Sequence, residues 1–587
     1  MKKIIIGFLF ILLLPVLSYS QTTFTKITTG AIVNDGGESW GCSWGDYDGD
    51  GRQDLLVVNR NATVDVHFFL YHNEGNGNFT RAVTGGDLLT DSAKYTTAVW
   101  GDYDNDGKLD LFLSTFGGEN NVLYHNINPT LPIFTKITSG AIVTDGGNSN
   151  SCSWVDFNND GLLDMCVTNY GQKRFLYQNN GSGTFTKIIT GGFVNDISRT
   201  IGCQWGDYNN DGLLDVYTAN NGVIVNNFFY VNNGAGNFTK NTSLNIVADT
   251  TKSFSSAWGD YNNDGYNDLF VASDGTRNNE LYKNNKDGSF TNDNTSAPAQ
   301  DQYSVMGNWA DYDNDGFLDL FVSRWQNQNN LLYHNNGNGT FTKILLGDIV
   351  NDHGNSFGCA WADYDNDGDM DLFVANINNE NNFLYRNNAT NENTNKWITI
   401  KCTGTTSNKS AIGAKVMVKA NINGTAQWQM REIVSETGYA SQNDIRAHFG
   451  LGTASIVDSI KILWPSGSIN TFTNVAVNKF ITITENGSLV GVNDNPNEVK
   501  SFELEQNYPN PFNPETKISY SLNHAGDVSL KVYDAEGKYI ETLKDGFSEA
   551  GTYSVKWNGT GYSSGIYFYV LKSSSGFSET KKMLLIK

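Results

Sequence analysis

Short apolar runs recur along the first two thirds of the chain, and each one follows an acidic stretch. Residues 55–58 (Leu-Leu-Val-Val) and 320–322 (Leu-Phe-Val) are typical, because apolar and polar positions do not alternate within them. Such short continuous runs are expected of strands that are covered on both faces. An aromatic segment with an Asn-Gly turn follows, as in residues 331–343, and predicts a two-strand hairpin. Together with the short strand that ends in a Trp before the acidic stretch, the pattern predicts a unit of four strands.

This unit is copied in tandem. The Trp and the acidic stretch occur seven times, at intervals of 51 to 56 residues. Four-stranded units at a near-constant period are typical of β-propeller blades, so we predict a seven-bladed propeller over residues 21–390. The seventh unit lacks its last strand, and residues 23–27 carry the missing sequence. The N-terminal segment is therefore predicted to complete the seventh blade and close the ring. The repeated tryptophans are expected to pack between blades: Trp44, Trp100, Trp154, Trp205, Trp258, Trp309 and Trp361.

The remaining regions differ from the repeats in composition. Residues 1–20 carry two lysines, an apolar run and a small-residue end, which is the order of a secretory signal peptide. Residues 396–485 predict a small β-rich domain, residues 486–505 a polar linker, and residues 506–587 an immunoglobulin-like β-sandwich. No later segment approaches the ~18 apolar residues of a membrane span, so no transmembrane segment is expected after signal removal. The predicted fold class is all-β.

Net charge and the positions of the cysteines further limit the kind of protein that this chain can be. The formal net charge is −22, which makes nucleic acid a poor partner. Four of the six cysteines share one position, four residues before the first Asp of an acidic stretch, where the other copies also have small residues. Because equivalent positions in different blades lie far apart, we expect buried free thiols there and no disulfides. These residues are Cys42, Cys152, Cys203 and Cys359.

The acidic stretch follows the pattern Asp-x-[Asp/Asn]-x-Asp-Gly-x-x-Asp in all seven copies. Positions 1, 3, 5 and 9 offer side-chain oxygens and position 7 a backbone carbonyl, while Gly at position 6 permits a tight turn. A ligand set of oxygens without His or Cys favours Ca²⁺ over zinc or copper. The first five spacings match an EF-hand loop, but position 12 is apolar and strands flank the loop. We therefore predict up to seven calcium-binding hairpin loops, and a metal-free Asp-Asn-Gly turn is the alternative for any single copy.

The predicted calcium ligands are Asp46, Asp48, Asp50, Arg52 and Asp54; Asp102, Asp104, Asp106, Lys108 and Asp110; Asp156, Asn158, Asp160, Leu162 and Asp164; Asp207, Asn209, Asp211, Leu213 and Asp215; Asp260, Asn262, Asp264, Tyr266 and Asp268; Asp311, Asp313, Asp315, Phe317 and Asp319; and Asp363, Asp365, Asp367, Asp369 and Asp371. Position 3 is Asn in the third, fourth and fifth loops and Asp in the other four. Since fewer negative ligands weaken calcium binding, we expect these three loops to lose calcium first.

The seven loops resemble those of the FG-GAP/VCBS family, which includes integrin α-chain propellers and many bacterial surface proteins. The resemblance implies a seven-bladed propeller with calcium on one face and ligand recognition on the other. Residues 396–485 resemble an ASPIC/UnbV domain, a family without a secure activity, through Gly413-Ala-Lys-Val, Ser435-Glu-Thr-Gly-Tyr, His448-Phe-Gly-Leu-Gly and Trp464-Pro-Ser-Gly. Residues 506–587 resemble a type IX secretion sorting domain through Asn507-Tyr-Pro-Asn-Pro-Phe-Asn-Pro. That resemblance implies the type IX secretion machinery and a secreted or outer-membrane-surface location in a Bacteroidetes-type bacterium.

One position after the second strand of each unit varies between copies. It carries Arg60, Phe116, Tyr170, Asn221, Asp274, Trp325 and Ile377. Repeat proteins vary where they bind, so Arg60, Phe116, Tyr170 and Trp325 are candidates for a ligand face, with ordinary exposed loops as an equal alternative for each residue. The hairpins carry His72, His125 and His334 at one shared position, and these are expected to be surface residues.

Three functions are compatible with these features. The leading hypothesis is a non-enzymatic, exported propeller that binds calcium and recognises an extracellular glycan or protein ligand. The alternative is a lyase or hydrolase that degrades extracellular polysaccharide on a propeller scaffold, for which a paired acid and base in a pocket would be required. A purely structural envelope protein is the third. The ligand, the oligomeric state and the role of the β-rich domain at residues 396–485 are not determined by the sequence.

Overall fold

The computed structural model describes residues 23–587 except 61–67, 76, 83–84, 92, 128–132, 223–225, 249–251, 390–393, 488, 493–502, 505, 508, 523–525, 549–550 and 574–577. The predicted signal peptide at residues 1–20 lies outside the described residues, as does most of the predicted linker at residues 486–505. The all-β prediction is confirmed, since the described chain consists of strands with a few short helical turns. None of the helices in the described part of the chain has the length and apolar character of a membrane span.

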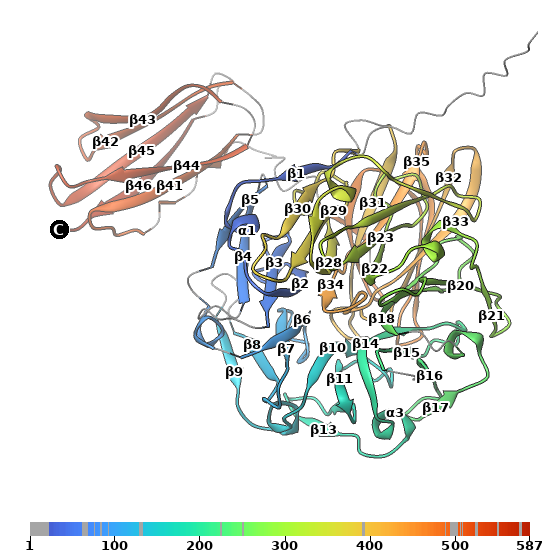
Figure 1. Cartoon of the computed structure of the whole chain (residues 1–587). Helices are drawn as coiled ribbons and strands as arrows, with labels where there is room; N and C mark the ends of the chain where they lie inside the picture. Colours follow the sequence, from blue (N-terminus) through green and yellow to red (C-terminus); the bar gives the residue numbers. More distant parts are fainter. Residues whose placement is uncertain are drawn as a thin grey trace, which may run out of the picture.

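Seven four-stranded antiparallel sheets form a ring in the larger part of the molecule (Figure 1). In each sheet the inner strand ends just before an acidic loop, and the second strand begins at the last Asp of that loop. From the inner to the outer strand the sheets are β2 (Ser39–Gly45), β3 (Asp54–Asn59), β4 (Phe68–Gly75) and β5 (Asn78–Arg81); β6 (Tyr95–Gly101), β7 (Asp110–Thr115), β8 (Val122–Asn126) and β9 (Phe134–Ile137); β10 (Ser149–Val155), β11 (Asp164–Gln172), β12 (Phe175–Asn179) and β13 (Phe185–Lys187); β14 (Ser198–Gly206), β15 (Asp215–Asn220), β16 (Phe228–Asn232) and β17 (Phe238–Asn241); β18 (Ser253–Gly259), β19 (Asp268–Ser273), β20 (Glu280–Asn284) and β21 (Phe290–Asn292); β22 (Ser304–Ala310), β23 (Asp319–Arg324), β25 (Leu331–Asn335) and β26 (Phe341–Lys343); and β28 (Ser356–Ala362), β29 (Asp371–Asn376), β30 (Phe383–Arg386) and β1 (Thr25–Ile27).

The ring closes in two ways that the sequence predicted. Strand β1 pairs with β30, so the N-terminal segment supplies the outer strand of the seventh sheet. Each repeated Trp is packed against the preceding sheet, and Trp44 of the first sheet donates its indole N–H to the carbonyl of Ala360 in the seventh, at 3.1 Å. Five of the other six indoles make the equivalent bond to a carbonyl of the inner strand before them, at 3.3–3.4 Å, and Trp205 donates to the hydroxyl of Ser153 at 3.0 Å. The tryptophans therefore join neighbouring sheets around the whole ring.

Short helical turns connect the sheets on their outer side. Each brings apolar residues into the gap between two sheets, as Ile32 and Val33 do in the first turn. These turns are α1 (Ala31–Asn34), η1 (Asp87–Thr90), α2 (Ala141–Thr144), α3 (Gly192–Asn195), η2 (Asn245–Val247), η3 (Ala297–Gln300) and η4 (Asp348–Val350). Two small pairings join neighbouring sheets, namely β11 with β14 and β24 (Gln328–Asn329) with β27 (His353–Gly354). All six cysteines are free and buried, which confirms the expectation for the four that share one position in the repeats.

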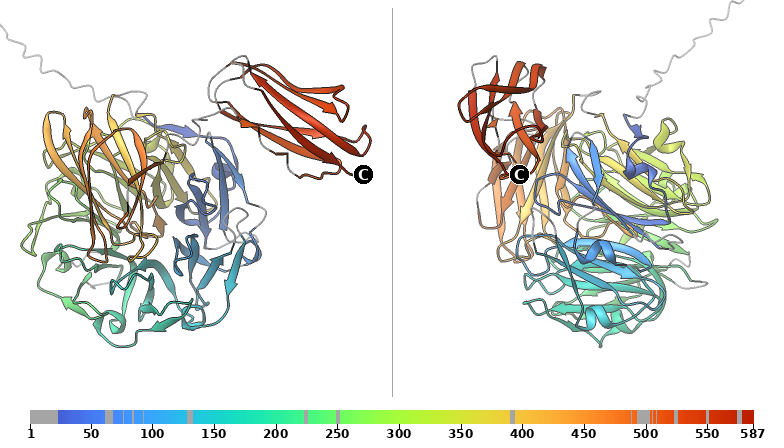
Figure 2. Two further views of the ribbon diagram at one scale, coloured as in Figure 1. Left: turned by 180° about the vertical axis from the view of Figure 1, so that it is seen from behind. Right: turned by 90° about the vertical axis from the view of Figure 1, so that its left-hand side faces the viewer.

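A second domain, residues 396–492, lies against one face of the ring and is called the middle domain here (Figure 2). It has two four-stranded sheets in the orders β35-β31-β38-β39 and β33-β32-β36-β37. Its core continues into the propeller, because Ile398 and Phe449 belong to the same buried cluster as Trp154. The strands are β31 (Lys396–Thr403), β32 (Lys415–Ile422), β33 (Thr425–Glu432), β34 (Ser441–Gln442), β35 (Ala447–Gly452), β36 (Val457–Leu463), β37 (Ile469–Val475), β38 (Lys479–Thr484) and β39 (Leu489–Val492).

Residues 433–446, between β33 and β35, run along the axis of the ring, and we call them the axial segment. Ala440 accepts a backbone hydrogen bond from Cys42 at 3.1 Å, and β34 pairs in parallel with β2. Gln442 bonds both the N–H and the carbonyl of Trp100, at 2.7 and 3.1 Å. Further contacts to the other five inner strands run through Ser435 to Trp154, Gly438 to Gln204, Tyr439 to Phe254, and Asn443 to Asn308 and Trp361. The axial segment thus touches all seven inner strands.

The C-terminal part of the chain forms a separate pair of sheets with its own buried core, which includes Phe512 and Trp557. The sheet orders are β40-β41-β44 and β43-β42-β45-β46. The strands are β40 (Glu503–Leu504), β41 (Glu515–Leu522), β42 (Gly526–Asp534), β43 (Tyr539–Ser548), β44 (Gly551–Asn558), β45 (Gly565–Ser573) and β46 (Ser578–Leu585).

Candidate calcium loops and the two faces of the propeller

Backbone hydrogen bonds hold the carboxylates of each acidic loop toward its centre. In the second loop, Asp102 accepts the N–H groups of Asp106 and Gly107 at 2.9 and 2.7 Å. Asp106 in turn accepts the N–H of Lys108 at 2.9 Å, so the position-7 residue donates to the position-5 carboxylate. Asp110 accepts the N–H of Tyr103 at 3.3 Å. The same bonding pattern recurs in the other loops.

The turn that bends the loop depends on two left-handed residues. Gly at position 6 has φ between 85° and 98° in all seven loops, and Asn at position 4 has φ between 56° and 61° in six. The Asn side chain also bridges neighbouring loops: Asn105 donates to the carbonyl of Gly161 at 2.9 Å. Equivalent bonds link the loops onward and back to the first loop. In the first loop Gly49 replaces this Asn, so that loop offers no side chain for a bridge to the second.

The donor set of these loops fits a hard divalent cation. Ligand oxygens of Asp46, Asp48 and Asp54 lie within 4.8 Å of one another, as do those of Asp102, Asp104 and Asp106. Asp46 Oδ1 is buried and accepts no hydrogen bond from the described residues. Burial raises the pKa of Asp54 to about 7 and that of Asp164 to about 9, because the charged form loses solvation there. A bound cation would supply the missing counter-charge, and hard oxygen donors in a flexible turn suit Ca²⁺ best.

An Asn that the sequence reasoning missed completes each loop from the hairpin. Asn126 donates its backbone N–H to Asp110 at 2.8 Å, and its side-chain amide reaches the carbonyl of Tyr47 in the preceding sheet at 2.9 Å. It therefore fixes the position-9 carboxylate and ties two sheets together. The signal was present, since every copy has Asn there: Asn73, Asn126, Asn179, Asn232, Asn284, Asn335 and Asn387.

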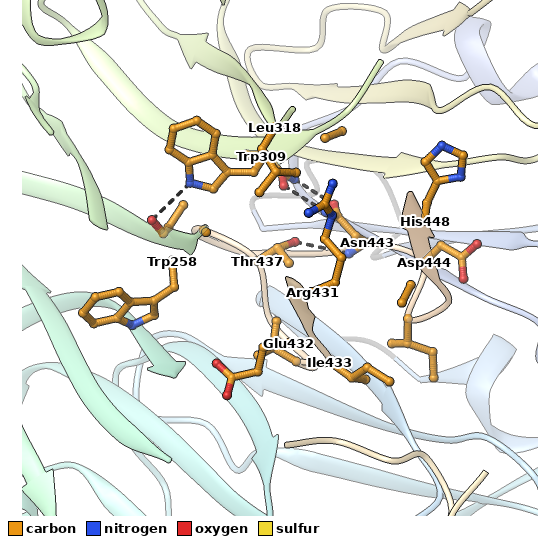
Figure 3. Close-up of a pocket in the computed structure, with 18 of the residues that line it drawn as sticks. Trp258, Trp309, Leu318, Arg431, Glu432, Ile433, Thr437, Asn443, Asp444 and His448 are labelled. Atoms are coloured by element: carbon orange, nitrogen blue, oxygen red, sulfur yellow. Dashed lines mark hydrogen bonds between the residues drawn. The ribbon is translucent and has the colours of Figure 1, made fainter. Parts of the chain in front are cut away.

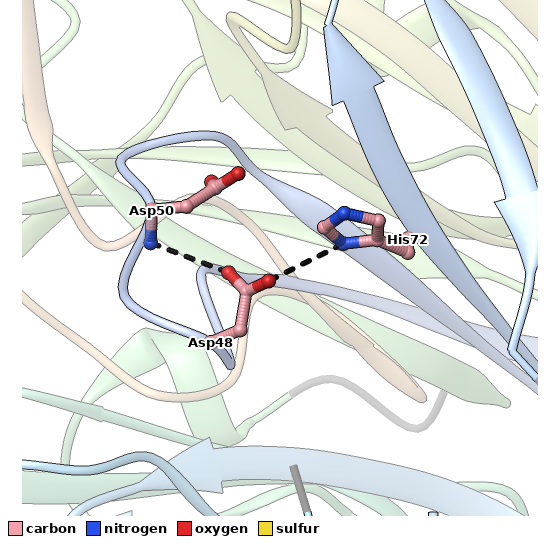
Figure 4. A group of neighbouring side chains, drawn as sticks. All are labelled: Asp48, Asp50 and His72. Carbon is pink, nitrogen blue, oxygen red and sulfur yellow. Dashed lines mark hydrogen bonds and ion pairs between the residues drawn. The ribbon is translucent and has the colours of Figure 1, made fainter. Parts of the chain in front are cut away.

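The hairpin histidines face the acidic loops. His72 and His125 are partly exposed, and the expectation of a surface residue was wrong for His334, which is buried. His72 Nδ1 lies 3.5 Å from Asp48, over the first loop (Figure 4). The same atom lies 3.1 Å from Asp54. His125 and His334 have the same relation to their own loops, and only 8% of the His334 side chain is exposed. In the seventh loop Arg386 Nε takes this place, 2.7 Å from Asp365.

These basic residues occur in the four loops that have Asp at position 3. The loops with Asn at position 3 have Gln178, Val231 and Lys283 at the hairpin position instead. A basic side chain thus faces the extra carboxylate, and the charge difference from the third and fourth loops is smaller than the ligand count suggests. The fifth loop does not follow this rule, because it has the basic Lys283 together with Asn262. The order of calcium loss that the sequence predicts depends on this compensation as well as on position 3.

Replacing two of these histidines should tighten calcium binding. The hydrogen bond that His72 donates to Asp54 is the main cause that raises the pKa of His72 to about 9, and the bond to Asp110 raises the pKa of His125 in the same way. A neighbouring cation opposes Ca²⁺ by about 1 kcal/mol, so the His72→Gln/His125→Gln variant should show two sites with roughly fivefold higher affinity. Chelator-competition titration measures this, with Gln178→Ala as the control. If the variant binds calcium with the same affinities as the unsubstituted protein, these histidines do not offset the carboxylates at position 3.

The middle domain covers the loop face of the ring. Its residues meet the position-1 aspartates of several loops: Lys415 Nζ is 2.8 Å from Asp207, and the Gly450 N–H donates to Asp311 at 3.1 Å. Arg446 donates to the carbonyl of Asp363 at 3.1 Å. The remaining contacts of this kind are Ser410 with Asp102, Glu432 with Asp207 and Lys401 with Asp46. Docking of this domain and the geometry of the loops are therefore connected.

A cavity of about 150 Å³ lies beside the axial segment on this covered side (Figure 3). Trp258 and Trp309 of two inner strands line it together with Arg431, Glu432 and His448 of the middle domain. Burial lowers the pKa of His448 to about 3, and burial raises the pKa of Glu432 to about 7. Both groups are used in contacts: His448 bonds Thr399 and Asn314, and Glu432 accepts from Asp207 and Asn267.

The four candidate ligand-face residues meet at the opposite end of the ring. Each lies six positions after the last Asp of its acidic loop, at the far end of the second strand, or roughly 20 Å along the strand. Arg60 lies over the ring of Phe116 at 3.7 Å, and the rings of Phe116 and Tyr170 are 6.4 Å apart. Trp325 contacts Phe254 at 6.2 Å. Trp40, Phe254, Phe357 and Tyr439 complete the cluster, which we call the mouth.

The mouth surface is half-buried, and its floor belongs to the axial segment. Arg60, Phe116, Tyr170 and Trp325 are each partly exposed. Tyr439 is only 1% exposed beneath them, and its hydroxyl donates to Asn150 at 3.3 Å. The other variable positions do not join this surface in the same way, since Ile377 is buried and Asn221 bonds Asp274.

Fold and loops together define a β-propeller protein with acidic hairpin loops. The family described as FG-GAP-like repeat matches residues 46–113, 156–218, 207–271, 260–322 and 311–374. The family described as ASPIC and UnbV matches residues 404–490, and the secretion system C-terminal sorting domain matches residues 506–587. The chain is thus an FG-GAP-repeat β-propeller protein with an ASPIC/UnbV domain and a type IX secretion sorting domain. The sorting domain implies secretion or outer-membrane-surface localisation in a Bacteroidetes-type bacterium, through the type IX machinery.

Individual proteins are more distant. The chain is 22% identical to cartilage acidic protein 1 of Xenopus tropicalis over 479 residues, which is 74% of this chain and 62% of that protein. It therefore spans less than two thirds of that relative. A solved structure, the Tc holotoxin pore of Photorhabdus luminescens, is similar with 13% identity and a TM-score of 0.32, covering 88% of this chain and 22% of that chain. That similarity is too low to support any conclusion about fold or function.

Proposed function

We propose that this exported propeller holds calcium in its acidic loops and binds an extracellular glycan or protein at the mouth without chemical turnover. The observation that carries the proposal is the convergence of Arg60, Phe116, Tyr170 and Trp325 into one partly exposed surface. Aromatic rings and arginine are the residue types that dominate recognition surfaces. The opposite face is occupied by the middle domain, which leaves the mouth as the open end of the axis.

The enzyme alternative has less support. Glu432 and His448 are a titratable pair beside a cavity, which is what an acid–base mechanism needs. The cavity of about 150 Å³ is below the ~300–1,000 Å³ of usual ligand sites, and both side chains are held in domain contacts. This argues for a structural role for the pair.

A binding screen with a turnover readout tests the proposal. The mature protein is assayed on panels of polysaccharides and surface proteins, with calcium or with EDTA, and released sugar ends are measured in parallel. We expect retention of at least one ligand in calcium, loss of retention in EDTA, and no released ends. Release of unsaturated or reducing ends would contradict the proposal.

Mouth variants locate the ligand in the same assay. The Phe116→Ala/Tyr170→Ala variant should weaken binding at least tenfold, since each buried aromatic contact contributes about 1 kcal/mol or more. The control is Leu345→Ala, because Leu345 is 70% exposed and follows the outer strand β26, away from the axis. Equal weakening in both variants, or in neither, would place the ligand elsewhere.

A further inference from the structure

The mouth contains a row of two aromatic rings between two arginines. Arg60 lies 3.7 Å from the ring of Phe116, Phe116 lies 6.4 Å from Tyr170, and Arg199 lies 5.5 Å from Tyr170. The row is held from both ends, because Arg60 also covers Trp40 at 4.2 Å and Arg199 is paired with Tyr170 across the β11–β14 ladder. Its geometry is therefore set by strands of the first four sheets.

The two arginines lack the acidic partners that other repeated cations have. Lys136, Lys187 and Lys240, at one shared position of three outer strands, each pair with an Asp at 2.5–2.9 Å. Within the described part of the chain, Arg60 and Arg199 form no ion pair with a carboxylate. In a protein with a net charge of −22, two such cations at the two ends of one row of rings mark a place that is complementary to an anion.

Open backbone lies beside both rings. Gly117 follows Phe116 and Gly171 follows Tyr170, each at positive φ, and no atom lies within 4 Å of where a Cβ would stand. Glycines at such positions allow a ligand to approach the main chain closely. This arrangement leaves room for a sugar ring along Phe116 and Tyr170, with the substituents of that ring directed to the two guanidinium groups.

We propose that the mouth binds a uronic-acid-containing polysaccharide, with sugar rings on Phe116 and Tyr170 and carboxylates on Arg60 and Arg199. The inference rests on the proposed function and names the ligand class of the same site. A guanidinium binds a carboxylate through two parallel hydrogen bonds, which an alternating acidic chain can offer repeatedly. A protein partner fits less well, because the aromatic side chains of the mouth are only partly exposed and do not form a broad exposed apolar patch.

The test compares one acidic chain with its own neutral form. Hyaluronan oligosaccharide and its carboxyl-reduced counterpart are titrated against the mature protein in calcium, at low and at high salt. We expect tight binding of hyaluronan that weakens with salt, and at least tenfold weaker binding of the reduced form. Arg199→Gln, at an exposed residue, and Arg60→Gln should each weaken hyaluronan binding at least tenfold and leave the reduced form unaffected. Arg81→Gln, on the outer strand β5, removes the same charge and should change neither.

The outcomes separate this inference from the proposed function. Equal binding of the acidic and neutral chains, or unchanged binding in both arginine variants, overturns the acidic ligand. Retention of a neutral glycan or a protein that depends on Phe116 and Tyr170 overturns it too, but leaves the proposed function standing. Binding of no panel member, or cleavage of hyaluronan, overturns both.

Discussion

Removal of calcium should lower the melting temperature of the mature protein by roughly 15–20 °C. A site that is filled at a hundred times its Kd adds about 2.7 kcal/mol, so seven sites give on the order of 20 kcal/mol. For a unit as large as the propeller with its middle domain, this corresponds to a shift of about that many degrees. Thermal melting in calcium and in EDTA measures it, and magnesium should restore little because it demands stricter octahedral geometry. Identical melting in both buffers would refute the calcium loops.

The metal-free protein should also depend on pH in a specific direction. Burial raises the pKa of Asp102 and Asp156 to about 7 and that of Asp215 to about 8, above the value near 3.8 of an unfolded chain. The folded state therefore keeps protons that the unfolded state has lost, and stability falls as pH rises through the folded pKa values. In EDTA the melting temperature should drop between about pH 4 and 8, from the unfolded to the folded pKa values, while in calcium this drop should be absent, because bound cations stabilise the ionised carboxylates.

The elements that the sequence predicted correctly are those encoded within one repeat. A loop such as Asp102–Asp110 carries its own turn residues and its own carboxylates, so spacing alone identifies it. The strand that closes the ring, β1, was predictable because its sequence matches the strand missing from the last repeat. The variable positions after the second strands were also informative, since four of them meet at the mouth.

Features that depend on contacts between distant segments were not predicted. The role of His72 at its hairpin position depends on the residue at position 3 of the loop that it faces. The two positions are separated in the sequence by more than the length of one strand. The middle domain gave no periodic signal that it would enter the ring. Its axial segment makes its contacts by burial and by single hydrogen bonds, such as Gln442 with Trp100, which no local pattern encodes.

One signal for the axial segment was nevertheless present in the repeats. The residue before the small inner-strand position is Gly41, Gly202 or Gly358 in three sheets and a larger residue in the other four. A Cβ on Gly41 would stand 2.1 Å from the Ala440 carbonyl, and one on Gly358 would stand 2.7 Å from Ser441. The glycines therefore lie where the axial segment passes closest to the inner strands. Their uneven distribution around the ring follows the course of the axial segment.

This contact gives a matched pair of substitutions with very different expected effects. Gly41→Ala forces the Ala440 backbone away from β2, so it should cost about 3 kcal/mol or more through overpacking and loss of the neighbouring axial bonds. Gly202→Ala is the control, because its Cβ would lie 3.3 Å from the nearest atom, the Gly438 carbonyl, which requires only a small shift. Denaturant midpoints in calcium measure the difference, and the protease sensitivity of residues 433–446 should rise in the first variant alone.

Because Tyr439 forms the floor of the mouth, Gly41→Ala should also weaken ligand binding, while Gly202→Ala should not. Equal stability of the two variants would mean that the axial segment does not hold the ring.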